Sequence, residues 1–526
     1  MLFRSKWIAR EDFAAARDVR PQRRIALLRE VSGKLNANQK VLVETLAASG
    51  GRLPVEMLSG LELPKSTLAG LVRRKLVEMV KEAAPFSISS MKPRSEDFSL
   101  SAEQRGVLAR IQTAIASRKF SVSLVHGVTG SGKTAVYLAA MQAVLEAGRS
   151  AILLVPEIGL TPVAAARLQA TFGEQAAILH SGLTAGERAG QWRRIRQGEA
   201  RIVVGTRSAV FAPVANLALI VVDEEHDTSY KQEETPRYHG RDVAILRAQQ
   251  AGAAVVLGSA TPALESFYNA QRGKYALLEL RERVEQRPLP EVEIVDMCEE
   301  FRATGEDLIF SRKLVSELRE RLERGEQAMI LLNRRGYSPV VLCRACGETV
   351  QCQNCAIALT HHKGRNRLLC HYCGFQRAVP ETCPKCASEY VQFLGTGSEK
   401  LEERLHGAFP RARVGRLDRD TVRGRGDFER ILSAFDAGEL DLLVGTQMIA
   451  KGHDIHGVTL VGVVGADFAL GFPDFRAAER TFQLLTQVAG RAGRGTMPGR
   501  VILQTDRKST RLNSSHIQKS RMPSSA

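Results

Sequence analysis

The sequence lacks any run of about 18 consecutive apolar residues, the length that a membrane-spanning helix requires, so no membrane span is predicted. Its opening residues, MLFRSKWIAR, have no apolar core of secretory length, so no export signal is expected. Cysteine is scarce outside one block, since only Cys298 of the nine cysteines lies beyond residues 343–386. In a chain that is not exported, closely spaced cysteines hold metal rather than disulfides. We therefore expect a cytoplasmic protein with a metal site.

Acidic residues are too few to balance the basic ones. The 526 residues include 74 Lys and Arg against 57 Asp and Glu, a formal net charge of +17. Residues 507–526 contain five basic residues and no acidic one, but the rest of the chain is still basic. This surplus of positive charge suits binding to a polyanionic partner. A soluble protein with a basic surface and no such partner would have the same composition. The length predicts about three to four domains of ordinary soluble composition.

The N-terminal region, residues 20–83, shows short helical patterns. Apolar residues recur at helical spacing in three segments: 36–48, 53–61 and from Pro64 onward. The last of these carries four basic residues: Lys65, Arg73, Arg74 and Lys75. A helix, a turn and a basic helix predict a winged-helix-like domain, with a small helical packing domain as the alternative. Residues 84–99, rich in proline, serine and charge, are predicted to be a linker.

From residue 100 onward, short apolar runs alternate with helical patterns, which predicts an α/β fold with buried parallel strands. The runs lie at residues 123–125, 151–155, 202–204, 219–222, 255–257, 328–332, 442–444, 460–464 and 501–504. They predict a first lobe over residues 100–285 and a second lobe over 286–340 and 391–506. The cysteine block, 341–390, interrupts the second lobe after its first predicted strand. Residues 507–526 are expected to be a disordered, non-native tail.

A glycine-rich loop, GVTGSGKT, follows the first apolar run and precedes a helical pattern over residues 135–147. Glycines let backbone N–H groups close around phosphates, and the helix N-terminus adds positive potential, which predicts an ATP site. Lys133 is expected to reach the β- and γ-phosphates, and Thr134 is expected to ligate Mg²⁺. The other predicted contacts to the nucleotide are Gly127, Thr129, Gly130, Ser131 and Gly132.

Two further motifs carry charges that nucleotide hydrolysis requires. Asp223 and Glu224 end an apolar run, where Asp223 suits Mg²⁺ coordination and Glu224 suits polarising the attacking water. Arg491 and Arg494 lie three residues apart, a spacing that puts both on one face of a helix. Because guanidinium groups stabilise a transferring phosphoryl group, one of them is expected to reach across the cleft between the lobes. Taken singly, the two motifs would be a solvated acidic turn and a basic surface turn.

Four Cys-x-x-Cys hooks fill the insertion: Cys343 with Cys346, Cys352 with Cys355, Cys370 with Cys373, and Cys383 with Cys386. Two hooks complete a tetrahedral site, so four hooks predict two structural zinc ions with no position open for water. Three pairings are possible, and nesting of the inner hooks within the outer ones is the most natural. An iron–sulfur centre is the alternative; His361, His362 and His371 could also be ligands, but the cysteines suffice. A segment of about 45 residues buries little core, so metal should supply its folding energy.

Seven segments in this order resemble the motifs of superfamily 2 helicases. They are GVTGSGKT, PEIGLT (156–161), GTRSA (205–209), DEEH (223–226), GSATP (258–262), GTQMIAKGHD (445–454) and QVAGRAGR (487–494). The cysteine insertion, with NRRGY (333–337) before it, narrows the resemblance to the PriA family of bacterial primosomal helicases. The resemblance covers residues 20–506. Family members begin with another DNA-binding domain and continue past the second lobe, so truncation at both ends is expected, with residues 1–19 a remnant or linker.

The resemblance implies two RecA-like P-loop helicase lobes and an ATP-dependent 3′→5′ DNA helicase. Such an enzyme acts at stalled or collapsed replication forks and initiates primosome assembly for replication restart. The implied partners are single-stranded and forked DNA, primosome proteins and single-stranded-DNA-binding protein. A monomer in the bacterial cytoplasm, associated with the nucleoid, is expected. The same resemblance implies nested zinc sites in the insertion.

The resemblance also assigns roles to single residues. It implies that Gln104 reads adenine, that Arg207 and the segment around Thr161 touch the DNA backbone, and that Ser259 and Thr261 link the ATP state to lobe movement. Two more positions, in the second lobe, would couple the lobes and contact DNA: Thr446 and Gln447. A loop from Tyr230 to His239 would couple DNA binding to hydrolysis. In that loop Tyr230 and Tyr238 would stack on bases, and Lys231 and Arg237 would meet phosphates.

Two other functions are compatible with parts of the sequence. One is a different superfamily 2 translocase, such as an RNA helicase or a chromatin-type motor, against which the cysteine insertion argues. The other is a scaffold that recruits primosome proteins without hydrolysing ATP. The presence of Lys133, Asp223, Glu224 and Arg494 together argues against the scaffold.

Overall fold

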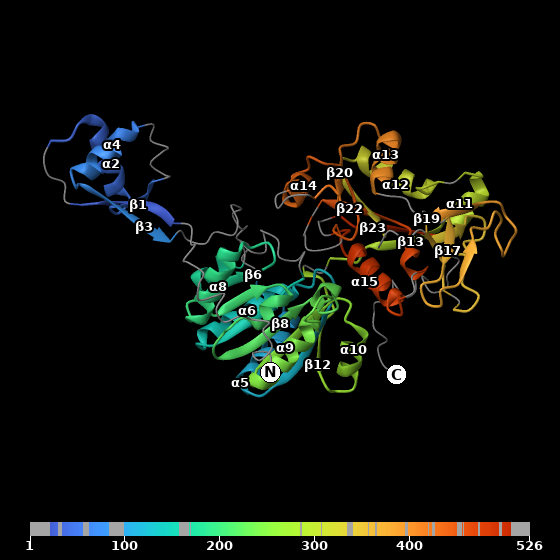
Figure 1. Ribbon diagram of the computed structural model, residues 1–526, viewed down its shortest axis with the longest axis horizontal. Helices are drawn as coiled ribbons and strands as arrows, with labels where there is room; N and C mark the ends of the chain where they lie inside the picture. The colour runs from blue at the N-terminus through green and yellow to red at the C-terminus, as the bar shows by residue number, and fades with distance from the viewer. Residues whose placement is uncertain are drawn as a thin grey trace.

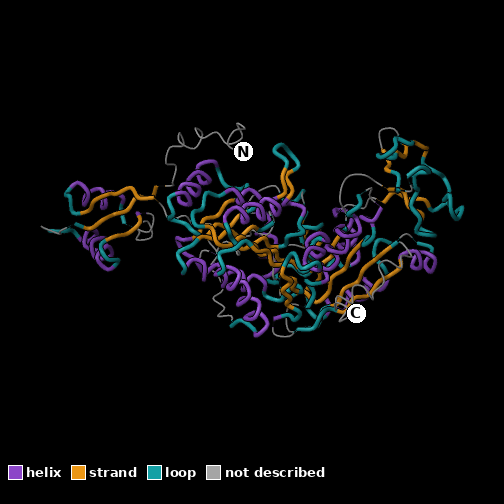
Figure 2. The backbone as a smooth tube through the Cα atoms, turned by 90° about the horizontal axis from the view of Figure 1, so that it is seen from below, coloured by secondary structure: helices purple, strands orange, loops and turns teal. Residues whose placement is uncertain are grey.

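The computed structural model describes residues 22–29, 34–55, 63–83, 99–156, 168, 170–284, 287–306, 308–333, 340–355, 357–362, 366–394, 398–418, 420–422, 427–449, 455, 457–471, 474–493 and 497–506. These residues form a small N-terminal unit, two α/β lobes and an insertion. Figures 1 and 2 show the small unit and the insertion at opposite ends, with the two lobes between them. Among the helices of the described residues, none combines the length and apolar character that a membrane crossing needs.

The N-terminal unit packs two helices against a three-stranded antiparallel sheet of order β2-β1-β3. Its elements are β1 (Gln22–Leu28), α2 (Ala37–Ala48), β2 (Arg52–Pro54), α4 (Lys65–Arg73) and β3 (Val77–Ala83). Leu46 and Leu71 are fully buried between the elements. Of the helix predicted over residues 53–61, Leu53 and Pro54 are wrong, because they belong to β2 and pair with β1, whereas Val55 is helical; residues 56–62 lie outside the described part. The winged-helix assignment stays a prediction.

The first lobe is a seven-stranded parallel sheet of order β12-β4-β11-β8-β5-β7-β6. The strands are β4 (Ser121–Gly127), β5 (Ser150–Leu154), β6 (Ala176–Leu179), β7 (Ile202–Gly205), β8 (Leu217–Asp223), β11 (Ala254–Ser259) and β12 (Ala276–Leu280). All five predicted strands are present. Two further strands, β6 and β12, were not predicted; they lie at the two edges of the sheet.

Helices cover both faces of this sheet, which explains why its strands read as continuous apolar runs. One face packs against α5 (Ala102–Ala116) and α6 (Lys133–Glu146). The other packs against α8 (Ala185–Arg196), α9 (Gly240–Ala251) and α10 (Leu264–Gln271). Short elements complete the lobe: η3 (Gly173–Gln175), η4 (Arg207–Phe211), η5 (Thr228–Tyr230), and the hairpin strands β9 (Lys231–Gln232) and β10 (Tyr238–His239).

The second lobe is a six-stranded parallel sheet of order β13-β23-β22-β14-β21-β20. Its strands are β13 (Glu291–Asp296), β14 (Gln327–Leu332), β20 (Val414–Leu417), β21 (Leu442–Gly445), β22 (Val458–Val464) and β23 (Arg500–Thr505). Its helices are α11 (Met297–Thr304), α12 (Arg312–Glu323), α13 (Ser398–Ala408), α14 (Asp427–Asp436), η8 (Phe468–Gly471) and α15 (Ala477–Ala489). The sequence had suggested that the insertion follows the first strand of this lobe. That prediction is wrong, because β13 precedes β14 and the insertion therefore follows the second strand.

The insertion has its own five-stranded antiparallel sheet of order β18-β17-β16-β15-β19. Its strands are β15 (Val340–Cys343), β16 (Thr360–His362), β17 (Arg367–Leu369), β18 (Gln376–Ala378) and β19 (Val391–Leu394). Val391–Leu394 had been assigned to the second lobe, but this strand pairs with β15 and so belongs to the sheet of the insertion. The two-lobed α/β architecture with a cysteine-rich insertion is confirmed.

Candidate functional site

The glycine-rich loop connects the end of β4 to the start of α6. Gly130 and Gly132 have φ angles of 81° and 76°, a region that glycine enters without steric cost. A Cβ on Gly127 would lie 2.6 Å from Oγ of Ser131, so the loop requires glycine at that position as well. The ammonium group of Lys133 is buried and donates to the carbonyl of Gly127 at 2.8 Å. The loop therefore holds a cation inside a ring of backbone groups, which is the arrangement that binds phosphates.

Gln104 lies against this loop, at the N-terminus of α5. Its Oε1 accepts from the N–H of Ser101 and its Nε2 donates to the carbonyl of Ser131, each at 2.8 Å. The Gln104 side chain also fills the space that a Cβ on Gly132 would need, with Nε2 only 2.3 Å from that position. The position beside the P-loop is compatible with adenine recognition, which stays a prediction.

Asp223 and Glu224 lie at the carboxyl end of β8. In the sheet, β8 pairs with β11, and β11 pairs with β4, the strand that leads into the P-loop. Burial, and next the charge of Glu224, raise the pKa of Asp223 to about 7, while Lys133 acts in the opposite direction. Glu224 has a φ angle of 45°, which costs a residue with a side chain some strain. Two crowded carboxylates beside a phosphate-binding loop are the donor set that a divalent cation prefers, so the residues fit Mg²⁺.

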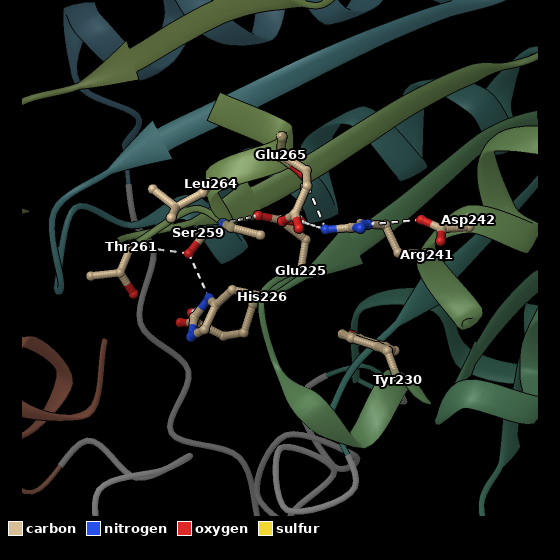
Figure 3. A network of polar contacts seen from close by, with 12 residues as sticks. Glu225, His226, Tyr230, Arg241, Asp242, Ser259, Thr261, Leu264 and Glu265 are labelled. Atoms are coloured by element: carbon tan, nitrogen blue, oxygen red, sulfur yellow. Dashed lines mark hydrogen bonds and ion pairs between the residues drawn. The ribbon is translucent and has the colours of Figure 1, made fainter. Parts of the chain in front are cut away.

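The acidic motif contacts the second lobe through His226. Nδ1 of His226 lies 2.7 Å from Oγ of Ser259, and its Nε2 lies 3.0 Å from Nε2 of Gln487 on α15. Gln487 also approaches Oε2 of Glu224, at 3.5 Å. Figure 3 shows Ser259 and Thr261 beside His226, where the Thr261 N–H donates to the Ser259 hydroxyl. Ser259 and Thr261 thus lie between the acidic motif and α15 of the second lobe; their role in linking the ATP state to lobe movement stays a prediction.

The end of α15 packs directly on the P-loop. A Cβ on Gly490 would lie only 2.2 Å from Oγ1 of Thr129, so glycine allows this close approach. Arg491 follows in the turn after α15 and is half-buried, while Arg494 lies outside the described residues. In the described part of QVAGRAGR, Gly490 lies against the P-loop and Gln487 lies against the acidic motif. Which arginine acts on the nucleotide stays a prediction.

Arg283 was not singled out in the sequence, yet it joins three parts of this site. It is buried in the connector after β12, where its guanidinium donates to the carbonyls of Gly490 and Gly493, both at 3.4 Å. Val284 next to it donates to the carbonyl of Gly130 in the P-loop at 3.0 Å. An arginine in a connector carries no motif that could have indicated this role.

The loop from Tyr230 to His239 differs from its prediction in one respect. Tyr230 is fully buried, and its hydroxyl contacts the carbonyls of Asp223 and Leu154 at 2.6 and 3.0 Å. The prediction that Tyr230 stacks on bases is therefore wrong, because its ring fills the core behind the acidic motif. Tyr238 is half-buried and packs edge-on against Phe211.

The basic side chains in and near this loop are of two kinds: some are exposed, and one is held by hydrogen bonds to the backbone. Lys231 and Arg237 are exposed on the hairpin. Arg207 instead donates to the carbonyls of Ser229 and Lys231, at 3.0 and 2.6 Å, and so fixes the base of the hairpin. Thr446 and Gln447 are half-buried just after β21, and Thr161 lies outside the described residues.

The eight hook cysteines form two groups, in each of which the sulfur atoms lie within 4.8 Å of one another. The outer group is Cys343, Cys346, Cys383 and Cys386, and the inner group is Cys352, Cys355, Cys370 and Cys373. The nested pairing is confirmed. Four sulfurs at such distances fit one tetrahedral zinc ion in each group. His362 and His371 lie 3.3 Å apart at their Nε2 atoms, outside both cysteine groups.

Local turns of the backbone orient the cysteine side chains of the hooks. In three hooks a residue with positive φ lets the chain turn back: Gly347 at 73°, Gly374 at 74° and Ala387 at 57°. The N–H of Phe375, followed by hydrogen bonds from the neighbouring thiols, lowers the pKa of Cys373 to about 6. A small apolar core includes Val341 and Leu368 together with Cys352 and Cys370 of the inner group, so metal ligation and packing stabilise the insertion together.

The outer cysteine group is joined to the second lobe. Arg344, inside the first hook, forms an ion pair with the buried carboxylate of Asp506. The thiol of Cys298 donates to the Asp506 carbonyl at 3.1 Å, and burial raises its pKa to about 12. Phe301 and Tyr390 pack edge-to-face, with ring centroids 4.8 Å apart. Cys298 is thus a buried packing residue.

Three family models match the chain. They are the DEAD/DEAH box helicase model over residues 104–269, the PriA DNA helicase Cys-rich region over 352–377, and the helicase conserved C-terminal domain over 391–496. The first two coincide with the first lobe and with the inner cysteine group, and the third with most of the second lobe.

Curated relatives agree with these matches. The replication restart protein PriA of Bacillus subtilis is 49% identical over 475 residues, covering 89% of this chain and 59% of the relative. The Synechocystis protein of that name is 49% identical, covering 75% and 48%, and the Treponema pallidum protein is 47% identical, covering 78% and 61%. The chain thus spans between about half and three fifths of the length of these relatives. By its motifs, its nested cysteine hooks and this similarity, the chain belongs to the PriA family of replication restart proteins.

Proposed function

We propose that the chain is an ATP-dependent DNA helicase that moves 3′→5′ along one strand, acts at stalled or collapsed forks and initiates primosome assembly. One observation carries the proposal: Gln487 of the second lobe contacts His226 and Glu224 of the first. Through this contact, a movement of either lobe alters the surroundings of the carboxylates proposed to act on the nucleotide. Closure of two lobes around a bound nucleotide is a general way to couple chemistry to movement.

The nucleotide is ATP with Mg²⁺, bound between the P-loop and the acidic motif. The P-loop backbone and Lys133 hold the phosphates, while Thr134 and Asp223 would hold Mg²⁺, which neutralises phosphate charge. Glu224 orients and polarises the attacking water. Arg491, or Arg494 beyond it, stabilises charge on the transferring phosphoryl group. Gln104 would recognise adenine by exchanging one of its present hydrogen bonds.

We propose that the protein binds DNA and moves along it. Lys231 and Arg237 on the hairpin and the exposed group Arg73, Arg74 and Lys75 on the N-terminal unit offer positive charge to phosphates. Thr446 and Gln447 would contact the strand from the second lobe. The insertion, with its two zinc ions, would engage DNA and primosome proteins, and single-stranded-DNA-binding protein would be a further partner. The proposed setting is the bacterial cytoplasm, at the nucleoid, with the chain as a monomer.

The test is the rate of ATP hydrolysis with no nucleic acid, with single-stranded DNA and with single-stranded RNA. We expect DNA to stimulate hydrolysis and Lys133→Ala to abolish it, because the P-loop ammonium is lost. Stimulation by RNA instead of DNA would identify a different superfamily 2 translocase. Equal rates with and without DNA would favour the scaffold that recruits primosome proteins.

A further inference from the structure

Glu225, the third residue of the acidic motif, does not belong to the nucleotide site. Its side chain is fully buried, and its carboxylate accepts from the Ala263 N–H at 2.7 Å, from the Ser266 hydroxyl at 2.8 Å and from Arg241 at 2.9 Å. Figure 3 shows this carboxylate between Arg241 and the first turn of α10. A buried carboxylate with three donors, one of them cationic, is fully satisfied and hence fixed in position.

Arg241 connects this carboxylate to the hairpin. It is the second residue of α9, which begins where the hairpin strand β10 ends at His239. Most of the Arg241 side chain is buried, and its Nη1 also contacts Oγ of Ser266 at 3.3 Å. A displacement of the C-terminal arm of the hairpin therefore acts on Arg241, and through it on Glu225.

The second lobe docks on the same first turn of α10. The N-cap of this helix, Ala263, has no side chain able to cap it, so its first N–H groups need other acceptors. Glu225 supplies the acceptor for the Ala263 N–H from within the lobe. Glu479 of α15 supplies another from the second lobe, because its Oε1 accepts from the N–H of Leu264 at 3.0 Å. Arg476, which also contacts Glu479, forms an ion pair with Glu265 in the same turn.

We infer that Glu225 and Arg241 are positioning residues that link the hairpin to the docking of the second lobe on α10. Glu225 fixes the helix end that Glu479 caps across the lobe boundary, and Arg241 fixes Glu225 relative to the hairpin. Occupancy of the hairpin by DNA then alters how α15 docks, and α15 carries Gln487 to the acidic motif. The inference rests on the proposed function and names a route by which DNA stimulates hydrolysis.

The test is the double variant Glu225→Gln/Arg241→Met, which removes both buried charges together and keeps an acceptor for the Ala263 N–H. ATP hydrolysis would be measured with and without an oligothymidylate, together with the KM for ATP and the affinity for the oligonucleotide. We expect DNA stimulation of kcat to fall about tenfold, the size of a typical coupling between two sites, while oligonucleotide affinity is unchanged. Wild-type stimulation in the double variant, or loss of oligonucleotide affinity, would overturn the inference.

A second pair of variants tests the inference from the other lobe and does not disturb the buried pair. Glu479→Ala should lose stimulation, whereas Glu479→Gln should regain part of it, because an amide oxygen still accepts from the Leu264 N–H. If the double variant does not fold, this pair decides the question: equal stimulation in Glu479→Ala and wild type overturns the inference. A wild-type protein that does not respond to DNA would refute the proposed function, and the inference with it.

Discussion

Nε2 of Gln487 lies 3.0 Å from Nε2 of His226, across the boundary between the two lobes. With the amide nitrogen of Gln487 as donor, Nε2 of His226 accepts, which places the ring proton on Nδ1. That proton then faces the hydroxyl of Ser259, 2.7 Å away. One imidazole thus connects α15 of the second lobe to the end of β11 in the first, beside the proposed catalytic carboxylates.

Replacing Gln487 with Ala should reduce DNA-stimulated ATP turnover. The variant removes the donor to His226 and the contact with Glu224, an effect worth about 1.4 kcal/mol, or about tenfold in kcat, if one hydrogen bond is lost from the transition state. The measurement is kcat with saturating single-stranded DNA. Gln250→Ala, at an exposed position of α9, is the matched control and should keep the wild-type rate. A normal rate in Gln487→Ala would contradict the assigned coupling.

Replacing Gly490 with Ala should impair turnover without unfolding either lobe. A Cβ there would lie 2.2 Å from Oγ1 of Thr129, and the clash is relieved most easily if the lobes move apart. We expect a lower kcat with an unchanged thermal midpoint. Gly106→Ala in α5 is the control, since a Cβ there meets nothing within 4 Å and alanine favours a helix interior by up to about 1 kcal/mol. Equal turnover in both variants would show that the close approach is unimportant.

Replacing Tyr230 with Phe distinguishes a buried anchor from a base-stacking residue. Loss of the hydroxyl leaves the carbonyls of Asp223 and Leu154 without this donor, so the free energy of unfolding should fall by about 1 kcal/mol. Affinity for single-stranded DNA should be unchanged, as measured by fluorescence anisotropy. Tyr268→Phe, at an exposed position of α10, should leave stability almost unaffected. Unaltered stability in Tyr230→Phe would contradict the buried geometry.

Single cysteine variants should remove the zinc ions one at a time. Cys355→Ser affects only the inner group and Cys346→Ser only the outer group, so each should lower bound zinc from about two ions per chain to about one. Metal analysis of the purified variants provides the count. Cys298→Ser should retain the full zinc content, because that thiol bonds to a carbonyl and belongs to neither group.

The two zinc losses should differ in their effect on stability. The outer group is joined to the second lobe through Arg344 and Asp506, whereas the inner group packs within the insertion. Cys346→Ser should therefore lower the thermal midpoint of the protein more than Cys355→Ser does. An equal effect of the two variants would mean that Arg344 does not carry the link.

Much of the fold could be predicted from sequence because its strands are buried on both faces. Runs such as those at residues 219–222 and 328–332 are apolar throughout, and each lies within an observed strand. The missed edge strands β12 and β13 contain charged residues among their apolar ones, whereas β6 is apolar but only four residues long. Residues 53–54 were misassigned because a short edge strand has too few residues to show its own period. The nested cysteine groups were predictable because each hook fixes two ligands at once.

The sequence by itself determined the class of chemistry, since the P-loop glycines, the acidic pair and the four hooks each need particular residue types at fixed spacing. Only the tertiary structure decided which of these side chains contact one another. Tyr230 turned out to be an internal anchor rather than a stacking surface, and Glu225 points to α10 instead of the nucleotide. Spacing along a chain specifies local turns, but contacts such as Gly490 with Thr129 join residues far apart in sequence. Those contacts depend on how two separately folded sheets pack together, and no local pattern encodes that packing.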